Sequence, residues 1–204
     1  MALREILPGI FTWPWFSERH GYDFNGWLVR DSGGNVCADP VDMADDVLDE
    51  IAALGVARIV LTNRNHTRAS AKLRARTGAR VAIHAADARY ATEQGAVVDD
   101  AVAAGERVGP FVVLAAPGKS PGEVALHWPE RRLLLVGDAC VGKPPGACAL
   151  LPEKVMDDPP ALRRSLRRLA ADVDFDVLLT GDGAPILSGA RDALQALVAT
   201  FPPE

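Results

Sequence analysis

The chain divides into short apolar runs and longer stretches in which apolar residues recur at helical spacing. Short apolar runs bounded by glycine, proline or polar turns predict strands, and the helical spacing predicts amphipathic helices. The clearest helix is 159–173, where Leu162, Leu166, Leu169 and Val173 share one face opposite a row of arginines that we expect to be solvated. The predicted strands are 26–30, 36–40, 57–61, 80–84, 111–115, 123–128, 132–137 and 176–180, and the predicted helices are 41–54, 69–77, 85–93, 159–173 and 188–201.

The order of these elements predicts an α/β fold. Strands 26–30 and 36–40 flank an Asp-Ser-Gly-Gly-Asn turn and form a hairpin, whereas later segments alternate between strand and helix. Residues 9–16 predict an edge strand, or a strand plus loop, and 138–158 predict a long irregular loop of functional importance. Two half-domains of mixed sheet, each covered by helices on its outer side, are compatible with this order.

Length and composition narrow the class of protein. The 204 residues suit one domain, 1–204, and no apolar run approaches the roughly 20 residues of a membrane helix. A net charge of -5 argues against nucleic acid or an anionic membrane as the main partner. The N-terminus lacks the pattern of a secretory signal, and the odd set of Cys37, Cys140 and Cys148 predicts reduced thiols in a cytoplasmic protein.

A polar loop between strand 57–61 and helix 69–77 is the strongest candidate for chemistry. A loop held at both ends by regular elements presents its side chains in a fixed arrangement. The loop reads Thr62-Asn63-Arg64-Asn65-His66-Thr67-Arg68. It resembles the metal-binding loop of the metallo-β-lactamase superfamily, whose pattern is Thr-His-x-His-x-Asp-His. Thr62 is kept, whereas Asn63, Asn65, Thr67 and Arg68 stand at the positions of the family's metal ligands.

Four further segments are similar to that family in the right order. Ala38-Asp39-Pro40 resembles the end of an early strand, and Gly118-Lys119-Ser120-Pro121-Gly122-Glu123 resembles Gly-His-Thr-Pro-Gly-His with Lys119 at a ligand position. Asp138 matches the aspartate that bridges two metals in the family, and Asp182 replaces the histidine of the closing Gly-His-Gly. The resemblance implies a four-layered αββα sandwich of the metallo-β-lactamase type with mixed sheets.

The replaced ligands lead to the main functional expectation, which is a metal-free binding protein or pseudoenzyme. Amides are poor zinc ligands, and cations repel a metal. We expect an ion network of Lys119, Arg68, Asp138 and Asp182 in place of the dinuclear centre, because a buried carboxylate needs a partner. No cofactor is expected, the ligand is an unknown small molecule, and a homodimer is left open. The predicted pocket consists of Asn63, Asn65, His66, Thr67, Arg68, Lys119, Asp138 and Asp182, with the two asparagines donating hydrogen bonds.

Two alternatives remain. One is a divergent hydrolase of small esters, thioesters or lactones that uses zinc or another divalent metal held by Asp138, Asp182 and either His66 or Glu123. His66 occupies an intervening position of the motif, so a supporting or surface role is favoured for it over a ligand role. Candidate catalytic residues are Lys119, Asp138, Asp182 and Arg68, with Lys119 as a general base if it is buried beside Arg68. The other alternative is a structural partner that makes contacts through 138–158.

Overall fold

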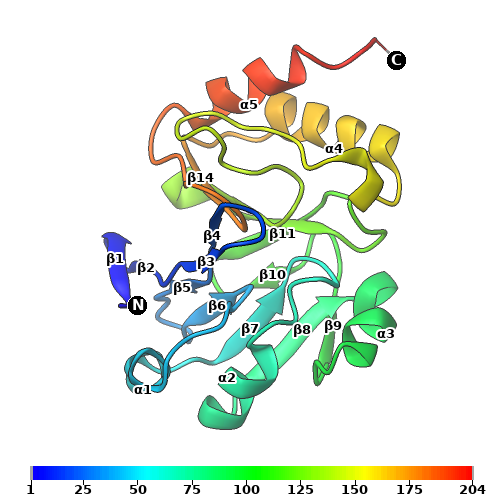
Figure 1. The fold of residues 1–204 in the computed structure, drawn as a ribbon. Coiled ribbons are helices and arrows are strands. Elements are labelled where there is room, and N and C mark those ends of the chain that lie inside the picture. Colours follow the sequence, from blue (N-terminus) through cyan, green and yellow to red (C-terminus); the bar gives the residue numbers. More distant parts are fainter. Residues whose placement is uncertain (1, 204) are drawn as a thin grey trace.

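The computed structural model describes residues 2–203 and contains two mixed sheets packed face to face (Figure 1). The first sheet has the order β1-β2-β5-β6-β7-β8-β9, with parallel pairing from β6 to β9. The second has the order β10-β11-β12-β13-β14, in which β13 and β14 are parallel. A separate hairpin joins β3 to β4. The strands are β1 Arg4–Leu7, β2 Ile10–Thr12, β3 Trp15–Ser17, β4 Tyr22–Phe24, β5 Trp27–Val29, β6 Val36–Ala38, β7 Arg58–Leu61, β8 Arg80–His84, β9 Asp100–Val102, β10 Arg107–Val108, β11 Phe111–Ala115, β12 Val124–Trp128, β13 Leu133–Val136 and β14 Val177–Thr180.

Helices cover the outer face of each sheet, so the fold has four layers in the order αββα. In Figure 1 the first three helices lie along one side of the molecule, and the last two lie along the opposite side. The α-helices are α1 Asp45–Leu54, α2 Ser70–Thr77, α3 Ala85–Glu93, α4 Pro159–Asp172 and α5 Ala190–Val198, with 3-10 turns at Pro129–Arg131 and Glu153–Val155. This arrangement confirms the predicted fold class.

The apolar core forms three layers that follow from the patterning of the elements. Side chains of both sheets meet in the middle layer, where Trp27, Phe111 and Leu135 are fully buried. An outer layer packs α1 and α2 on the first sheet through residues such as Ile51 and Leu73. The other outer layer packs α4 and α5 on the second sheet. Because each strand between two layers is covered on both faces, its sequence is a continuous apolar run rather than an alternating one.

Local predictions differ from the structure at three places. The helix expected over 41–54 begins at Asp45. Two acidic residues occupy its first turn and stabilise the helix there, because their charges interact favourably with the positive end of the helix dipole. In the sequence, 17–25 is a polar stretch that favours a connection, and 95–110 has no clear pattern because Gly105, Gly109 and Pro110 interrupt it. The structure nevertheless contains β4 in the first segment and β9 and β10 in the second. Within the described residues no helix is long and apolar enough to cross a membrane.

The packing between the sheets makes a testable prediction. Leu135 is fully buried between them, so Leu135→Ala removes buried methyl groups and leaves a cavity. We expect a loss of about 2–5 kcal/mol in the free energy of unfolding, measured by chemical denaturation. Val97→Ala is the control, because Val97 is 47% exposed and its loss should change stability by less than about 0.5 kcal/mol. Equal effects of the two substitutions would contradict the description of the core.

Candidate functional site

The ends of β6, β7, β13 and β14 bring polar residues from both sheets to one edge of the sandwich. Asp39 directly follows β6 and adopts a positive φ of 48°. Its Oδ1 accepts a hydrogen bond from the backbone N–H of Thr62 at 2.8 Å, and its Oδ2 accepts one from the Thr62 hydroxyl at 2.6 Å. Asp39 therefore fixes the start of the loop that follows β7, a role that sequence reasoning did not assign to it.

His66 joins the two sheets through its imidazole. Its side chain is fully buried, with Nδ1 2.9 Å from Asp39 Oδ2 and Nε2 3.0 Å from Asp138 Oδ1. Burial disfavours the imidazolium, but the charges of Asp39 and Asp138 outweigh that effect and raise the pKa of His66 to about 10. Gly181 leaves room for the ring, because a Cβ there would lie 2.8 Å from His66 Cε1. His66 is thus central to the site, and the expectation that allowed it a surface position is wrong.

Two ion pairs occupy the wall next to this imidazole. Lys119 Nζ lies 3.2 Å from Asp138 Oδ2, and an Arg68 guanidinium nitrogen lies 3.5 Å from Asp182 Oδ1. The guanidinium also stacks over the ring of Phe24 at 4.2 Å from its centroid. Burial opposes ionisation of Asp138, yet His66 and Lys119 hold its pKa well below the ordinary range. The contacts between the four charged residues of the expected network are therefore present.

The two asparagines act differently from each other. Asn65 accepts a hydrogen bond from Lys119 Nζ through its Oδ1 at 3.0 Å, which corrects the expectation that it donates. Asn63 donates from Nδ2 to Glu123 Oε1 at 3.4 Å and accepts from the backbone N–H of Asn65 at 2.8 Å. Asn63 therefore shapes the loop as well as supporting its neighbours.

Glu123 lies at the base of the cluster. Its Oε1 accepts a hydrogen bond from the backbone N–H of Asp138 at 2.7 Å, and its side chain is buried. Burial and the charge of Asp138 raise the pKa of Glu123 well above its ordinary value. Within residues 2–203, Glu123 Oε2 has no hydrogen-bond partner. The cluster thus contains one buried carboxyl group whose environment favours its neutral form.

Asp87 supports the loop that carries Lys119, a role that was not predictable from its position as an acid in the first turn of α3. Its carboxylate is fully buried and accepts hydrogen bonds from the Ser120 hydroxyl, from the Gly122 N–H and from the Arg64 N–H. These bonds connect the loops after β7 and β11. Asp87 therefore positions residues of the site without lining it.

A cavity of about 760 Å³ opens above the cluster. Five of the predicted pocket residues line it, and three others, Asn63, His66 and Thr67, are buried outside its lining. Tyr22 and Phe24 of β4 border the same cavity. Burial and the nearby Asp182 raise the pKa of Tyr22 to about 12, so its hydroxyl stays protonated at neutral pH. The lining residues predicted from sequence are Asn65, Arg68, Lys119, Asp138 and Asp182.

Three side chains in the cluster offer ligand atoms to a metal ion. Those of His66, Asp138 and Asp182 lie within 4.8 Å of one another. One imidazole and two carboxylates suit zinc and other first-row divalent ions. Burial and the charge of Asp138 raise the pKa of Asp182 to about 6, and its buried Oδ1 has no hydrogen-bond partner within the described part of the chain. The donor set therefore fits one divalent ion.

The charges of the cluster fit one ion as well. The cluster contains four carboxyl groups, which belong to Asp39, Glu123, Asp138 and Asp182. Two positive charges oppose them, one from Lys119 and one from Arg68. In the absence of metal, a proton on His66 together with one on Glu123 would balance the remaining charge, which is the direction in which both pKa values are shifted. One divalent ion beside a neutral His66 balances it equally well. Lys119 and Arg68 therefore do not exclude a single ion.

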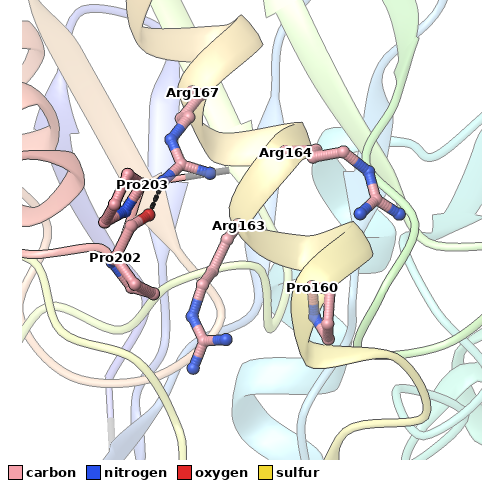
Figure 2. Close-up of a pocket in the computed structure, with 6 residues that line it drawn as sticks. All are labelled: Pro160, Arg163, Arg164, Arg167, Pro202 and Pro203. Atoms are coloured by element: carbon pink, nitrogen blue, oxygen red, sulfur yellow. Dashed lines mark hydrogen bonds between the residues drawn. The ribbon is translucent and has the colours of Figure 1, made fainter.

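The arginine row of α4 forms a second concave surface, of about 340 Å³, with the C-terminal prolines (Figure 2). Arg163 pairs with Glu153, and Arg167 donates to the carbonyl oxygen of Pro202. Figure 2 shows Arg164 pointing away from this contact. Because two of its three arginines already have partners, this surface is a weaker candidate than the cavity above His66.

The fold and the strand-end cluster agree with one family. The family model described as metallo-beta-lactamase superfamily matches residues 4–201, and the chain therefore belongs to that superfamily. The hydroxyacylglutathione hydrolase of Cereibacter sphaeroides (strain ATCC 17029 / ATH 2.4.9) is 32% identical over 171 residues, which is 79% of this chain and 61% of that protein. The chain thus spans about three fifths of the length of these curated relatives.

Solved structures show the same relationship. TTHA1623, whose structure was determined in a di-iron-bound form, is 26% identical with a TM-score of 0.68, covering 94% of this chain and 98% of that chain. A metallo-beta-lactamase from Pontibacter korlensis is 16% identical with a TM-score of 0.78, covering 98% of this chain and 99% of that one. The second similarity concerns the fold alone.

The pairing of Lys119 makes a prediction about stability. In chelator-treated protein, Lys119→Met leaves Asp138 without its ammonium partner in a buried setting. We expect the free energy of unfolding to fall by about 1–3 kcal/mol, measured by denaturant titration. Lys72→Met is the control, since its partner Asp45 is exposed and the pair should contribute little. An unchanged stability of Lys119→Met would show that the pair does not hold the site together.

Proposed function

We propose that the protein is a hydrolase of small esters or thioesters that binds one divalent metal ion through His66, Asp138 and Asp182. The observation that carries this proposal is the convergence of their ligand atoms within 4.8 Å at the base of the cavity. It corresponds to the alternative expectation from the sequence, and of the two third ligands which that expectation allowed it selects His66 and gives Glu123 a supporting role.

The environment of His66 supports this assignment. A ligating imidazole usually donates its other N–H to a carboxylate, which fixes the orientation and tautomer of the ring. Asp39 Oδ2 lies 2.9 Å from Nδ1 and fills that role, leaving Nε2 to face Asp138. Asp39 is itself held by both donors of Thr62, so the ring has little freedom to rotate.

A bound divalent ion supplies Lewis acidity and lowers the pKa of water, which is the chemistry that ester hydrolysis needs at neutral pH. Lys119 uses one N–H toward Asp138 and one toward Asn65, so its third N–H remains for an oxygen of the substrate. Tyr22 stays protonated and offers a second donor at the wall of the cavity. Arg68 holds the Asp182 carboxylate and is held in turn by Phe24.

The relatives also support a hydrolase rather than a pseudoenzyme. Curated proteins that are 32% identical carry the name hydroxyacylglutathione hydrolase, and a structure 26% identical was determined with two irons bound. These names describe those proteins, and the curated hydrolases are longer than this chain. We take from them the reaction type, hydrolysis, as part of the proposal.

A second candidate function is a metal-free protein that binds a small molecule without cleaving it. The ion pairs Lys119–Asp138 and Arg68–Asp182 favour it, because they already supply positive charge to both proposed carboxylate ligands. In this state the doubly protonated His66 donates to Asp39 and Asp138. Metal content separates the two functions.

The metal assignment gives a prediction. Protein purified without chelators should contain about one zinc, manganese or iron ion per chain, measured by elemental analysis. Chelation should lower the Tm and abolish hydrolysis of S-acetyl mercaptopropionate, and the matching metal should restore both. Asp182→Asn should weaken metal binding by at least about tenfold, the loss that removal of a group supporting a ligand already causes, since it replaces a charged ligand with an amide.

Asp192→Asn is the control for this experiment, because Asp192 is an exposed acid on α5, away from the cluster. It should keep the metal content and activity of the parent. A protein that lacks metal under all loading conditions, with unchanged Tm after chelation, would leave the metal-free binding protein as the function of this site.

A further inference from the structure

The mouth of the cavity above His66 carries positive charge that the proposed chemistry does not use. Arg19 lies in the turn between β3 and β4, Lys143 follows β13 in the long loop, and Lys154 lies in the 3-10 turn Glu153–Val155. All three line the cavity, and all three are exposed. Segments distant in the sequence thus place their cations around one opening.

These cations have no acidic partner among the described residues. Lys143 contacts the ring of Tyr22 at 5.0 Å through a cation–π interaction, and neither Arg19 nor Lys154 forms an ion pair in residues 2–203. Glu153, next to Lys154, is engaged by Arg163 instead. Many other exposed cations in the chain do have partners, as Arg76 does with Asp49 and Arg132 with Asp174. The opening therefore keeps its positive charge available.

The acids of the cavity do not cancel this charge. Asp138 and Asp182 are the acidic residues that line it within the described chain, and each is paired deeper in the site with Lys119 or Arg68. The whole chain has a net charge of -5, so the cationic mouth runs against its overall balance. A local excess of one sign at a cleft raises the concentration of oppositely charged ligands there.

One side of the same cavity is apolar. Leu150, Leu151 and Val155 line it, and Val155 is 44% exposed, which is high for a large aliphatic side chain. Val141 completes this side from the start of the loop. An apolar wall beside unpaired cations matches a ligand that has a hydrophobic part and an acidic end.

We propose that the ligand of this cavity is an amphiphilic anion, whose acidic group meets Arg19, Lys143 and Lys154 and whose apolar part packs on Leu150, Leu151 and Val155. This inference rests on the proposed function in one respect: the scissile ester or thioester lies between the acidic group and the cluster around His66. Recognition of the anion itself requires no metal, so it is tested separately from hydrolysis.

The binding test uses two fluorescent probes with the same aromatic skeleton. Anilinonaphthalene sulfonate carries a negative charge, and phenylnaphthylamine does not. Metal-depleted folded protein should bind the sulfonate at one saturable site at least about tenfold more tightly than the neutral probe, and the difference should shrink at high salt. Equal affinity for the two probes at low salt would overturn the proposal.

Charge reversal locates the site. Lys143→Glu combined with Lys154→Glu should weaken binding of the sulfonate by about tenfold or more, with little effect on the neutral probe. Arg107→Glu is the matched control, because Arg107 is exposed on β10 and does not line the cavity. If Arg107→Glu lowers the affinity for the sulfonate as much per reversed charge as the double variant does, the net charge of the protein determines binding. The cations at the cavity would then not form a specific site, and the proposal fails.

Hydrolysis supplies a second readout with metal-loaded protein. S-acetyl mercaptopropionate has a carboxylate, and S-acetyl mercaptoethanol is its neutral counterpart. The double variant should raise KM for the first by about tenfold and leave its kcat and the kinetics of the second nearly unchanged. Failure of both substrates to react while the sulfonate still binds as described would refute hydrolysis and keep anion recognition. Hydrolysis of both with equal KM would refute anion recognition and keep the enzyme.

Discussion

The hydrogen-bonded imidazole of His66 is the contact on which the arrangement of the site depends. Asp39 follows a strand of the first sheet, Asp138 follows a strand of the second, and the buried ring of His66 touches both carboxylates. Burial of either carboxylate without a hydrogen-bonded partner would cost folding free energy. The two sheets are therefore connected at this edge by an imidazole between two carboxylates, in addition to the apolar layer between them. Gly181 allows the ring to enter that space.

Most of the fold could be predicted because its determinants are local. The apolar runs of β7 and β13 indicate strands, and Gly55 and Gly78 terminate α1 and α2 with positive φ. The pairing of these elements into four layers was implied by the family resemblance. β4 could not be predicted, because Tyr22-Asp23-Phe24 is short and half-buried, lies outside the two main sheets, and pairs with β3 and, at Phe24, with the distant Asp182. Its stability comes from contacts with distant residues, which a sequence pattern does not reveal.

The site was predictable where it depends on strand ends and unpredictable where it depends on loop geometry. Lys119 and Asp138 meet because their loops close the same edge, which the resemblance of their motifs to the family's ligand positions implied. The position of His66 follows instead from a turn in which Asn63 Oδ1 accepts from the Asn65 N–H and the His66 N–H donates to the Asn63 carbonyl. This tight turn directs the intervening residue inward. Motif spacing alone left a surface position open for His66, whereas its side chain is fully buried.

Charge explains how a site that has lost most family ligands still suits one metal. In the dinuclear centre that this motif resembles, two divalent ions supply four positive charges. Here Lys119, Arg68 and one divalent ion supply the same four, which equals the charge of Asp39, Glu123, Asp138 and Asp182 when all are ionised. The cations at two former ligand positions are therefore compatible with one divalent ion in this cluster, because four positive charges then meet four carboxylates. Under the proposed function, these cations take the place of the second metal and leave the first position usable.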